Sequence, residues 1–421
     1  MKTKIEALLE ILVVLCSMLL VATLPAITTA SEDDFTLGIY GNANMDDTID
    51  MRDTTYIKLA IFGKKPKTDL ADANYDGKVS MLDVGQTNLI ILGKEKELTI
   101  LDDAERSITL KMPLERVVLA RMGCEEALVA IGAVDRVVGV TSGIKKYRPY
   151  VSEAGGLMDL PSVGYIYTEL DYEKIVELNP DLVYMCPLFV EEVDEKIPDE
   201  IPVVALEVED ADIKIVTKGF KTLGVIFGKE KEANEVIDWI QKYDRIVEDR
   251  TKDLNPEEKP TFYIETYDDW VTYGSDNWDG KVAAECGGRS IIDGVDLFIP
   301  GENREYVISP EWLLEQNPDV IFRRVYAQSN LVTEEEAEER LEKLVDRPGW
   351  ANVNAVKNGR VYLYNSRIIF TPANVVGSCY FAKCLQPDLF SDLNPREIAD
   401  EYWNTFIGID FPEMPVYPEP S

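Results

Sequence analysis

The sequence contains no histidine among its 421 residues. This absence excludes zinc sites built on imidazole, Ser-His-Asp and Cys-His nucleophile systems, and imidazole general bases, on which most hydrolytic sites depend. Positive charge is also scarce, because 43 Lys and Arg stand against 77 Asp and Glu, for a net charge of −34. Such a chain repels phosphate, so nucleic acid and anionic membrane surfaces are not expected as partners.

Cysteine pairs of the CxxC type are missing as well, so a structural zinc site is not expected. The sequence has one long apolar run, residues 11–24, which follows a charged start and precedes Thr28, Thr29 and Ala30. This order predicts a signal peptide over residues 1–30 with cleavage after Ala30, and hence a secreted or cell-surface, extracytoplasmic protein. An uncleaved membrane anchor is the alternative. Cleavage leaves five cysteines, so at least one is unpaired, although Cys379 and Cys384 are close enough in sequence to bond.

Two loops near the N-terminus place oxygen side chains at the spacing of EF-type calcium loops. Positions 1, 3, 5 and 12 hold Asn or Asp in both, and position 7 offers its backbone carbonyl. Gly77 allows the sharp turn of the second loop, whereas Asp47 stands there in the first, so we expect the Asp72–Asp83 loop to bind calcium more tightly. The expected metal positions are Asn42, Asn44, Asp46, Thr48 and Asp53, then Asp72, Asn74, Asp76, Lys78 and Asp83.

The duplicated loop-helix units, with Asp at position 12 and no entering helix, resemble a dockerin domain. The resemblance covers residues 38–95. It implies a small α-helical domain that folds on calcium and docks onto a cohesin-type partner. A calcium-stapled structural cap without a cohesin is the alternative.

A helix, an Asn-Pro-Asp stop and an apolar strand occur twice in the rest of the chain, over residues 170–185 and 308–323. The proline keeps the preceding Asn out of the helical region, so each helix ends there. Strands without polar alternation are typical of sheets covered on both faces. We therefore predict an α/β fold with two Rossmann-like lobes. Lobe 1 is expected at residues 107–228, a long inter-lobe helix at 229–254, lobe 2 at 255–407 and a loose proline-rich tail at 408–421.

Several segments in this order resemble substrate-binding proteins of ABC importers for iron-siderophore complexes, haem and cobalamin. The resemblance implies two α/β lobes joined by one rigid long helix, little closure on binding, and delivery of ligand to a membrane permease. The predicted two-lobed body contains no hydrolase motif, so we predict that the protein is not an enzyme. The matching segments are residues 116–118, 126–132, 136–140, 178–183, 284–291, 314–321 and 349–362.

Ligand contacts in such a fold come from loops after the carboxyl ends of the strands. Aromatic rings there would stack on a planar macrocycle or catecholate, and arginines would pair with carboxylates. For each residue the alternative is a role in packing or surface charge. The residues in these loops are Arg121, Met122, Ser142, Tyr147, Met185, Cys186, Tyr267, Trp270, Arg323, Arg324, Tyr364 and Arg367.

The expected ligand is a metal chelate, either a corrinoid or a ferric siderophore. Haem ranks lower, because without histidine its axial ligand would have to be Tyr, Met or Cys. Two other functions compete with this one. The first is a cell-surface scaffold subunit that docks onto a cohesin. The second is a dockerin-borne, polysaccharide-acting enzyme that would use paired carboxylates such as Asp268 and Asp269.

Overall fold

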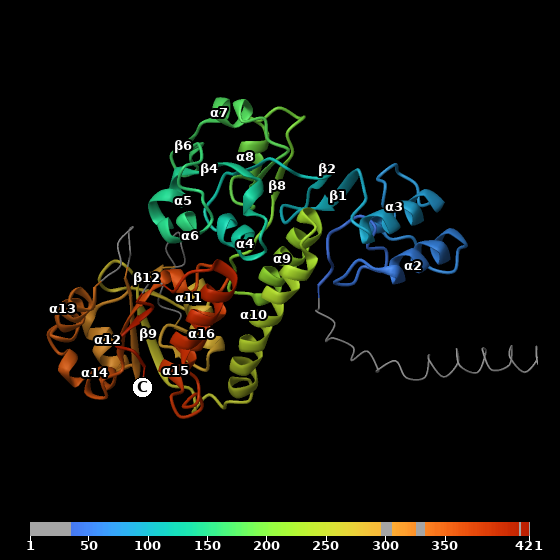
Figure 1. The fold of residues 1–421 in the computed structure, drawn as a ribbon. Coiled ribbons are helices and arrows are strands. Elements are labelled where there is room, and N and C mark those ends of the chain that lie inside the picture. The colour runs from blue at the N-terminus through green and yellow to red at the C-terminus, as the bar shows by residue number, and fades with distance from the viewer. Residues whose placement is uncertain (1–34, 296–304, 326–332, 412–413, 421) are drawn as a thin grey trace, which may run out of the picture.

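The computed structural model describes residues 35–295, 305–325, 333–411 and 414–420. The predicted signal peptide lies outside these residues. No helix in the described ranges is both long and apolar enough to cross a membrane. In Figure 1 two α/β lobes lie one above the other, and a small helical module lies beside the upper one.

The N-terminal module contains two short helices, α2 (Met51–Ile61) and α3 (Met81–Ile91), and a 3-10 turn, η1 (Asp69–Ala71). Both helices begin with a capping box, in which the aspartate at loop position 12 accepts from the backbone N–H of the helix N-cap. The inner faces meet around a small apolar core of Ala43, Ile57, Ala71 and Val84.

This module packs directly on an antiparallel hairpin, β1 (Glu97–Leu101) and β2 (Ser107–Lys111). Leu101 N donates to Gly38 O at 2.7 Å. A Cβ at Gly38 would lie 2.6 Å from Leu101 O, so the approach requires glycine. The module and lobe 1 therefore form one continuous hydrophobic core, to which the module contributes Leu37, Ile39 and Ile90.

Lobe 1 is built on a parallel sheet with the strand order β4-β3-β7-β8. Alternate side chains of its strands enter two separate apolar cores, so both faces are buried. The strands are β3 (Val117–Leu119), β4 (Val137–Val140), β7 (Leu182–Met185) and β8 (Val203–Ala205), with a small hairpin of β5 (Gly164–Tyr165) and β6 (Glu169–Leu170). The helices are α4 (Cys124–Ala130), η2 (Val134–Arg136), α5 (Ser142–Tyr147), α6 (Pro149–Ala154), α7 (Tyr172–Glu177) and α8 (Val190–Asp194).

Two helices lead from lobe 1 to lobe 2, α9 (Ile213–Phe227) and α10 (Glu230–Thr251). Gly228, at φ +61°, ends α9 in the left-handed conformation that glycine adopts without strain. The 22 residues of α10 span about 33 Å at 1.5 Å per residue. This helix touches α4 of lobe 1 and α15 (Val375–Leu385) of lobe 2, and it runs alongside both lobes in Figure 1.

Lobe 2 contains a mixed sheet with the order β12-β10-β9-β13-β14-β15, and β11 also pairs with β9. Four strands pair in parallel: β9 (Thr261–Glu265), β11 (Arg289–Ser290), β13 (Val320–Val325) and β14 (Val361–Asn365). β10 (Val271–Tyr273) pairs antiparallel with both β9 and β12 (Glu305–Val307), and β15 (Val416–Tyr417) pairs antiparallel with β14. The remaining helices are α11 (Trp278–Glu285), α12 (Pro310–Gln316), α13 (Glu334–Val345), η3 (Trp350–Asn352), α14 (Asn354–Lys357), η4 (Ser366–Ile368), α16 (Pro395–Tyr402) and η5 (Trp403–Ile407). The predicted two-lobed α/β fold is confirmed.

The duplicated Asn-Pro-Asp motif has the same geometry in both lobes. Asn179 and Asn317 adopt the left-handed conformation, with φ of 45° and 50°, and end α7 and α12. Asp181 Oδ2 accepts from the backbone N–H of Arg116 at 2.9 Å, and Asp319 Oδ2 accepts from Thr261 N at 2.9 Å. Each motif thus stops a helix and ties the following strand to its neighbour.

The prediction of a loose C-terminal tail is wrong for its described part. Val416 and Tyr417 form β15, which pairs antiparallel with Tyr364 and Leu363 of β14. The edge of β14 would otherwise expose unpaired backbone groups, and the tail covers it. A disulfide between Cys379 and Cys384 is also absent, because all five cysteines in the described ranges are free and buried.

Candidate ligand-binding site

Arg148 is one of several residues that link the two lobes at their junction. Arg148, between α5 and α6, donates from Nη2 to the carbonyl of Phe370 in lobe 2 at 2.9 Å. Three carboxylates of lobe 1 surround the same guanidinium, at 2.5 Å for Glu209, 3.1 Å for Glu126 and 3.5 Å for Glu125. Burial alone would lower the pKa of Arg148, but the three carboxylates raise it above its ordinary value. Burial raises the pKa of Glu125 to about 7.

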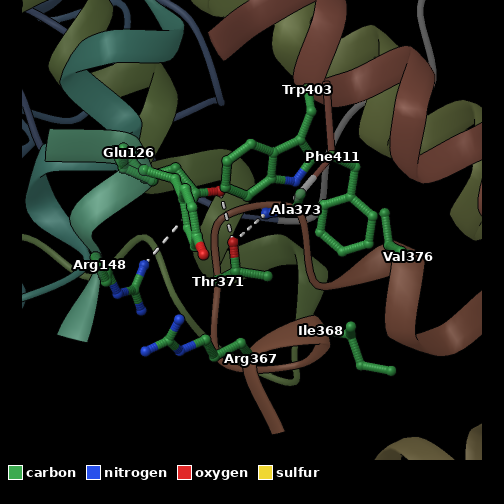
Figure 2. A pocket seen from close by; sticks show the side chains of 11 residues that line it. Glu126, Arg148, Arg367, Ile368, Thr371, Ala373, Val376, Trp403 and Phe411 are labelled. Carbon is green, nitrogen blue, oxygen red and sulfur yellow. Dashed lines mark hydrogen bonds and ion pairs between the residues drawn. The ribbon is translucent and has the colours of Figure 1, made fainter. Parts of the chain in front are cut away.

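Glu126 extends this network across the junction. Its Oε1 accepts from Thr371 Oγ1 at 2.6 Å and from Tyr402 OH at 3.2 Å, both in the C-terminal half of the chain. Figure 2 shows Thr371 pointing at Glu126 beneath the rings of Trp403 and Phe411. The cavity that they line lies at the junction of the two lobes and has a volume of about 30 Å³. It has room for one or two water molecules and is too small for a chelate.

A ladder of aromatic rings forms one wall of lobe 1 beside this junction. Ring centroids of Tyr147 and Tyr165 are 6.0 Å apart, those of Tyr165 and Tyr167 5.4 Å, and those of Tyr167 and Phe189 5.8 Å. Arg121 lies over the Tyr167 ring at 5.8 Å. The side chain of Tyr167 is 48% exposed. Phe189 has a φ of +68°, a strained conformation for a bulky residue, and such strain is often found at ligand sites.

In lobe 2, a second wall combines arginine with aromatic rings. The guanidinium of Arg324 lies 4.7 Å from the ring centroid of Tyr267 and 4.8 Å from that of Phe370. Its Nη1 is 3.4 Å from the carboxylate of the buried Asp279. Burial raises the pKa of Asp279, and the charge of Arg324 partly offsets that rise. Tyr267 remains 38% exposed, so its ring is available to a ligand.

The structure brings several of the predicted site residues to the junction. Arg367 donates to the backbone carbonyl of Tyr147, so it links the lobes directly. Arg121 contacts the thiol of Cys186, which is itself buried. The partly exposed residues at the carboxyl ends of the two sheets are Arg121, Met122, Ser142, Tyr147, Trp270, Arg323, Arg324 and Arg367.

Three of the predicted contacts are wrong, because the side chains of Met185, Cys186 and Tyr364 are buried. Met185 is the last residue of β7 and points into the apolar core of lobe 1. Tyr364 lies within β14, and its hydroxyl donates to Asp279. Trp270 is partly exposed, but its ring packs edge-to-face on Trp350 at 6.0 Å. In each case a strand or the turn that follows it directs the side chain inward. Successive side chains of a strand point to opposite faces, so an error of one residue in the position of the strand reverses the predicted direction.

The aromatic residues Tyr165, Tyr167 and Phe189 were missed by the sequence reasoning. Tyr165 and Tyr167 lie in the β5–β6 hairpin, outside the main sheet of lobe 1, and Phe189 immediately precedes α8. Strand alternation could not have located them, because Tyr167 lies in the turn that joins β5 to β6.

The two loops of the N-terminal module that are predicted to bind calcium offer oxygen ligands of the type that calcium prefers. Asp83 is buried and accepts from the backbone N–H of Asn74 at 3.2 Å and of Ser80 at 2.7 Å. In the first loop the Asn42 Oδ1 atom is buried and has no hydrogen-bond partner within the described residues. The donor chemistry fits a hard cation, although no three acidic, His or Cys side chains in the described ranges converge tightly enough to hold a metal as they stand.

Comparisons with known proteins agree with this architecture. A family model described as periplasmic binding protein matches residues 118–368, more than half of the chain. The molybdate-binding protein MolA of Haemophilus influenzae is 23% identical over 333 residues, 73% of this chain and 90% of MolA. The Fe(3+)-citrate-binding protein YfmC of Bacillus subtilis is 22% identical over 269 residues, 63% of this chain and 78% of YfmC.

The same fold is found in the crystal structure of the TroA-like periplasmic binding protein FepB from Veillonella parvula. It aligns with a TM-score of 0.66 at 23% identity, over 76% of this chain and 98% of FepB. The prediction that the protein is not an enzyme is confirmed by these relatives. The chain belongs to the periplasmic binding protein family, whose members are extracytoplasmic substrate-binding proteins that pair with the permeases of ABC transporters.

Proposed function

We propose that the protein captures a metal chelate, a ferric siderophore or a corrinoid, between its lobes and delivers it to an ABC importer. The observation that carries this proposal is the pair of walls at the carboxyl ends of the two sheets. Lobe 1 presents the Tyr147–Tyr165–Tyr167–Phe189 ladder, and lobe 2 presents Arg324 beside the exposed ring of Tyr267. Such surfaces suit a ligand with flat faces and acid groups. Capture of Fe(3+)-citrate by a relative supports a chelated metal as cargo.

Haem is a less suitable ligand for this site. It needs an axial ligand from the protein, and with no histidine the candidates are Met, Cys and Tyr. Met185 is fully buried and Cys186 is 5% exposed and in contact with Arg121, which leaves the partly exposed Met122 and the exposed Tyr267 as the candidates. Chelates that carry all their own metal ligands avoid this requirement.

Removal of one ring from each wall tests whether the ligand bridges the lobes. We expect Tyr167→Ala and Tyr267→Ala each to weaken binding of the best ferric or corrinoid chelate about three- to tenfold, the loss of one stacking contact. Intrinsic fluorescence quenching by increasing chelate gives the affinity. Phe62→Ala, which removes an exposed ring far from both walls, should leave it unchanged. A loss confined to one wall would show that the ligand does not bridge the lobes.

For the N-terminal module we propose dockerin-like calcium binding, with the second loop tighter, and docking onto a cohesin-type partner. The calcium ligands would be the oxygen groups at the loop positions identified from the sequence, with Asp53 and Asp83 closing the two shells. Exposed apolar side chains at equivalent positions of α2 and α3 support docking. These are Met51 and Phe62 on or beside α2, and Met81 and Leu92 on or beside α3.

The close packing of the module favours a second candidate, a calcium-stapled cap with no docking partner. Asp47, at position 6 of the first loop, forms a largely buried ion pair with Lys221 of α9. Gln86 of α3 donates to Glu97 O at 2.6 Å. A cap of this kind would stabilise lobe 1 through calcium. In either case we propose that the protein is exported by the signal peptide predicted over residues 1–30.

A further inference from the structure

A cavity of small-molecule size lies where the connecting helices α9 and α10 meet lobe 2. It is lined by the start of α9, the C-terminal half of α10, α11 and the start of α15, and its volume is about 620 Å³. This volume is within the range of small-molecule sites. Of the described residues that line it, none belongs to the two aromatic walls, so the cavity is separate from the proposed chelate site.

Carboxylates from three different helices line this cavity. Asp212 is the N-cap residue of α9, Asp244 and Glu248 lie one turn apart on α10, and Glu285 is the last residue of α11. Burial raises the pKa of Asp244 to about 6, and the charges of Glu248 and Asp212 add to this rise. Burial also raises the pKa of Glu285, and Asp212 and Asp244 raise it further. The four carboxylates therefore form one cluster of like charge.

Two members of this cluster lack a cationic partner. The side chains of Asp244 and Glu285 form no ion pair or hydrogen bond in the part of the chain that the structure describes. The charge of Lys281 partly offsets the rise in the pKa of Glu285, and only Arg245 does so for Asp244. The lysines that line the cavity are Lys214, Lys252, Lys259 and Lys281. None of them lies within ion-pair distance of either carboxylate, so both carboxylates are available to an added cation.

A buried amide at the same cavity has no partner for its oxygen. Asn374 is the N-cap residue of α15, lines the cavity and is only 4% exposed. Its Nδ2 donates to the backbone carbonyl of Asp210, just before α9. Its Oδ1 is a buried acceptor without a hydrogen-bond partner among the described residues. A buried acceptor that lacks a donor is destabilising, so a ligand that brings a donor to Asn374 gains binding energy.

The chemistry and spacing of these groups indicate the class of ligand. Ionised carboxylates and an amide oxygen accept hydrogen bonds, so the ligand must donate them and carry positive charge. A single metal ion does not fit, because no three acidic, His or Cys side chains in the described ranges converge closely enough to hold one. A flexible organic cation with two or more amino groups reaches acceptors on separate helices, and each ammonium group has three donors.

We propose that this cavity binds an aliphatic polyamine, whose ammonium groups pair with Asp244 and Glu285 and donate to Oδ1 of Asn374. The bound ligand bridges the long helix α10 and two helices of lobe 2, α11 and α15. It also relieves the repulsion between the carboxylates, so its binding stabilises the contact between α10 and lobe 2. This site is additional to the chelate site and does not depend on it.

The test is calorimetric titration of the full chain with putrescine and with spermidine, in calcium that fills the loops of the N-terminal module. We expect one saturable site per chain for at least one of the two amines. Asp244→Asn and Glu285→Gln each remove a negative charge at nearly constant side-chain size and should weaken binding about three- to tenfold. The control Asp238→Asn removes an exposed carboxylate of α10 that does not line the cavity, and it should leave the affinity unchanged.

The outcomes separate a built site from general attraction to an acidic chain. Losses in both cavity variants and none in the control support the site. Equal losses in all three variants would show an effect of net charge alone and would overturn it. Absence of saturable binding for both amines would overturn it as well. A calcium titration that loses one bound ion in Asp244→Asn, but not in the control, would overturn the polyamine in favour of a metal ion.

Discussion

Replacing Arg148 with Met is expected to lower the free energy of unfolding by about 3–5 kcal/mol, the usual cost of removing one partner from a buried ion-pair network. Glu125, Glu126 and Glu209 would be left buried without their shared cation. The hydrogen bond to Phe370 O would be lost as well, so the joint between the lobes should loosen. Chemical denaturation at pH 8 measures the effect. Lys231→Met, which breaks only an exposed pair with Glu235, is the matched control and should leave stability unchanged.

The pH dependence identifies the cause of this loss. Burial raises the pKa of Glu125 from 4.5 to about 7 in the folded protein. The folded state thus binds more protons than the unfolded chain between these values, so this stabilisation is fully present below about pH 4.5 and lost as the pH rises through about 7. Without Arg148 the carboxylates repel one another more strongly when ionised. The loss in Arg148→Met should therefore be smaller at pH 5 than at pH 8, and a loss independent of pH would contradict the electrostatic origin.

Calcium is expected to stabilise the whole protein, with Asp83→Ala removing the tighter of two sites. Calcium at about one hundred times its dissociation constant adds about 2.7 kcal/mol to the stability of the state that binds it. Because the module and lobe 1 share one core, melting of lobe 1 should move to higher temperature together with the module. Calorimetric titration of the full chain counts the sites, and thermal melts with calcium or a chelator measure the linkage.

Asp83 also accepts from the N-cap backbone of α3, so its removal weakens the helix even without calcium. Asp76→Ala avoids this effect, because Asp76 lies at loop position 5 outside the capping box, and it should weaken the same site. Asp69→Ala removes an exposed carboxylate that is not a ligand position and serves as the control. Two unchanged sites in both loop variants would contradict the assignment of the second loop.

The parts of the fold that depend on local chemistry could be predicted from the sequence. Asn179 and Asn317, each before a proline, had to leave the helical conformation, and this signal alone located equivalent elements in two lobes. Gly228 marked the end of α9 because glycine adopts the left-handed conformation without strain. The burial of Met185 and Cys186 could not be predicted in this way, since a shift of one residue at a strand end reverses the direction of a side chain.

The features that depend on distant segments could not be predicted. The pairing of Val416 with Tyr364 joins residues 52 positions apart and leaves no local pattern in the sequence. Arg340 and Lys343 of α13 lie beside Arg323 and Arg324 because α13 folds back next to the end of β13. The sequence located only the latter pair, because these two directly end a predicted strand.

The central claim is that the two lobes together capture a metal chelate, and the most direct test is titration calorimetry of the full-length protein with ferric citrate, an uncharged ferric trihydroxamate and cyanocobalamin. We predict one saturable site per chain, with a dissociation constant of about 1 μM or below for at least one ferric or corrinoid chelate, near −8 kcal/mol in binding free energy. Absence of saturable binding for all three chelates would contradict this claim.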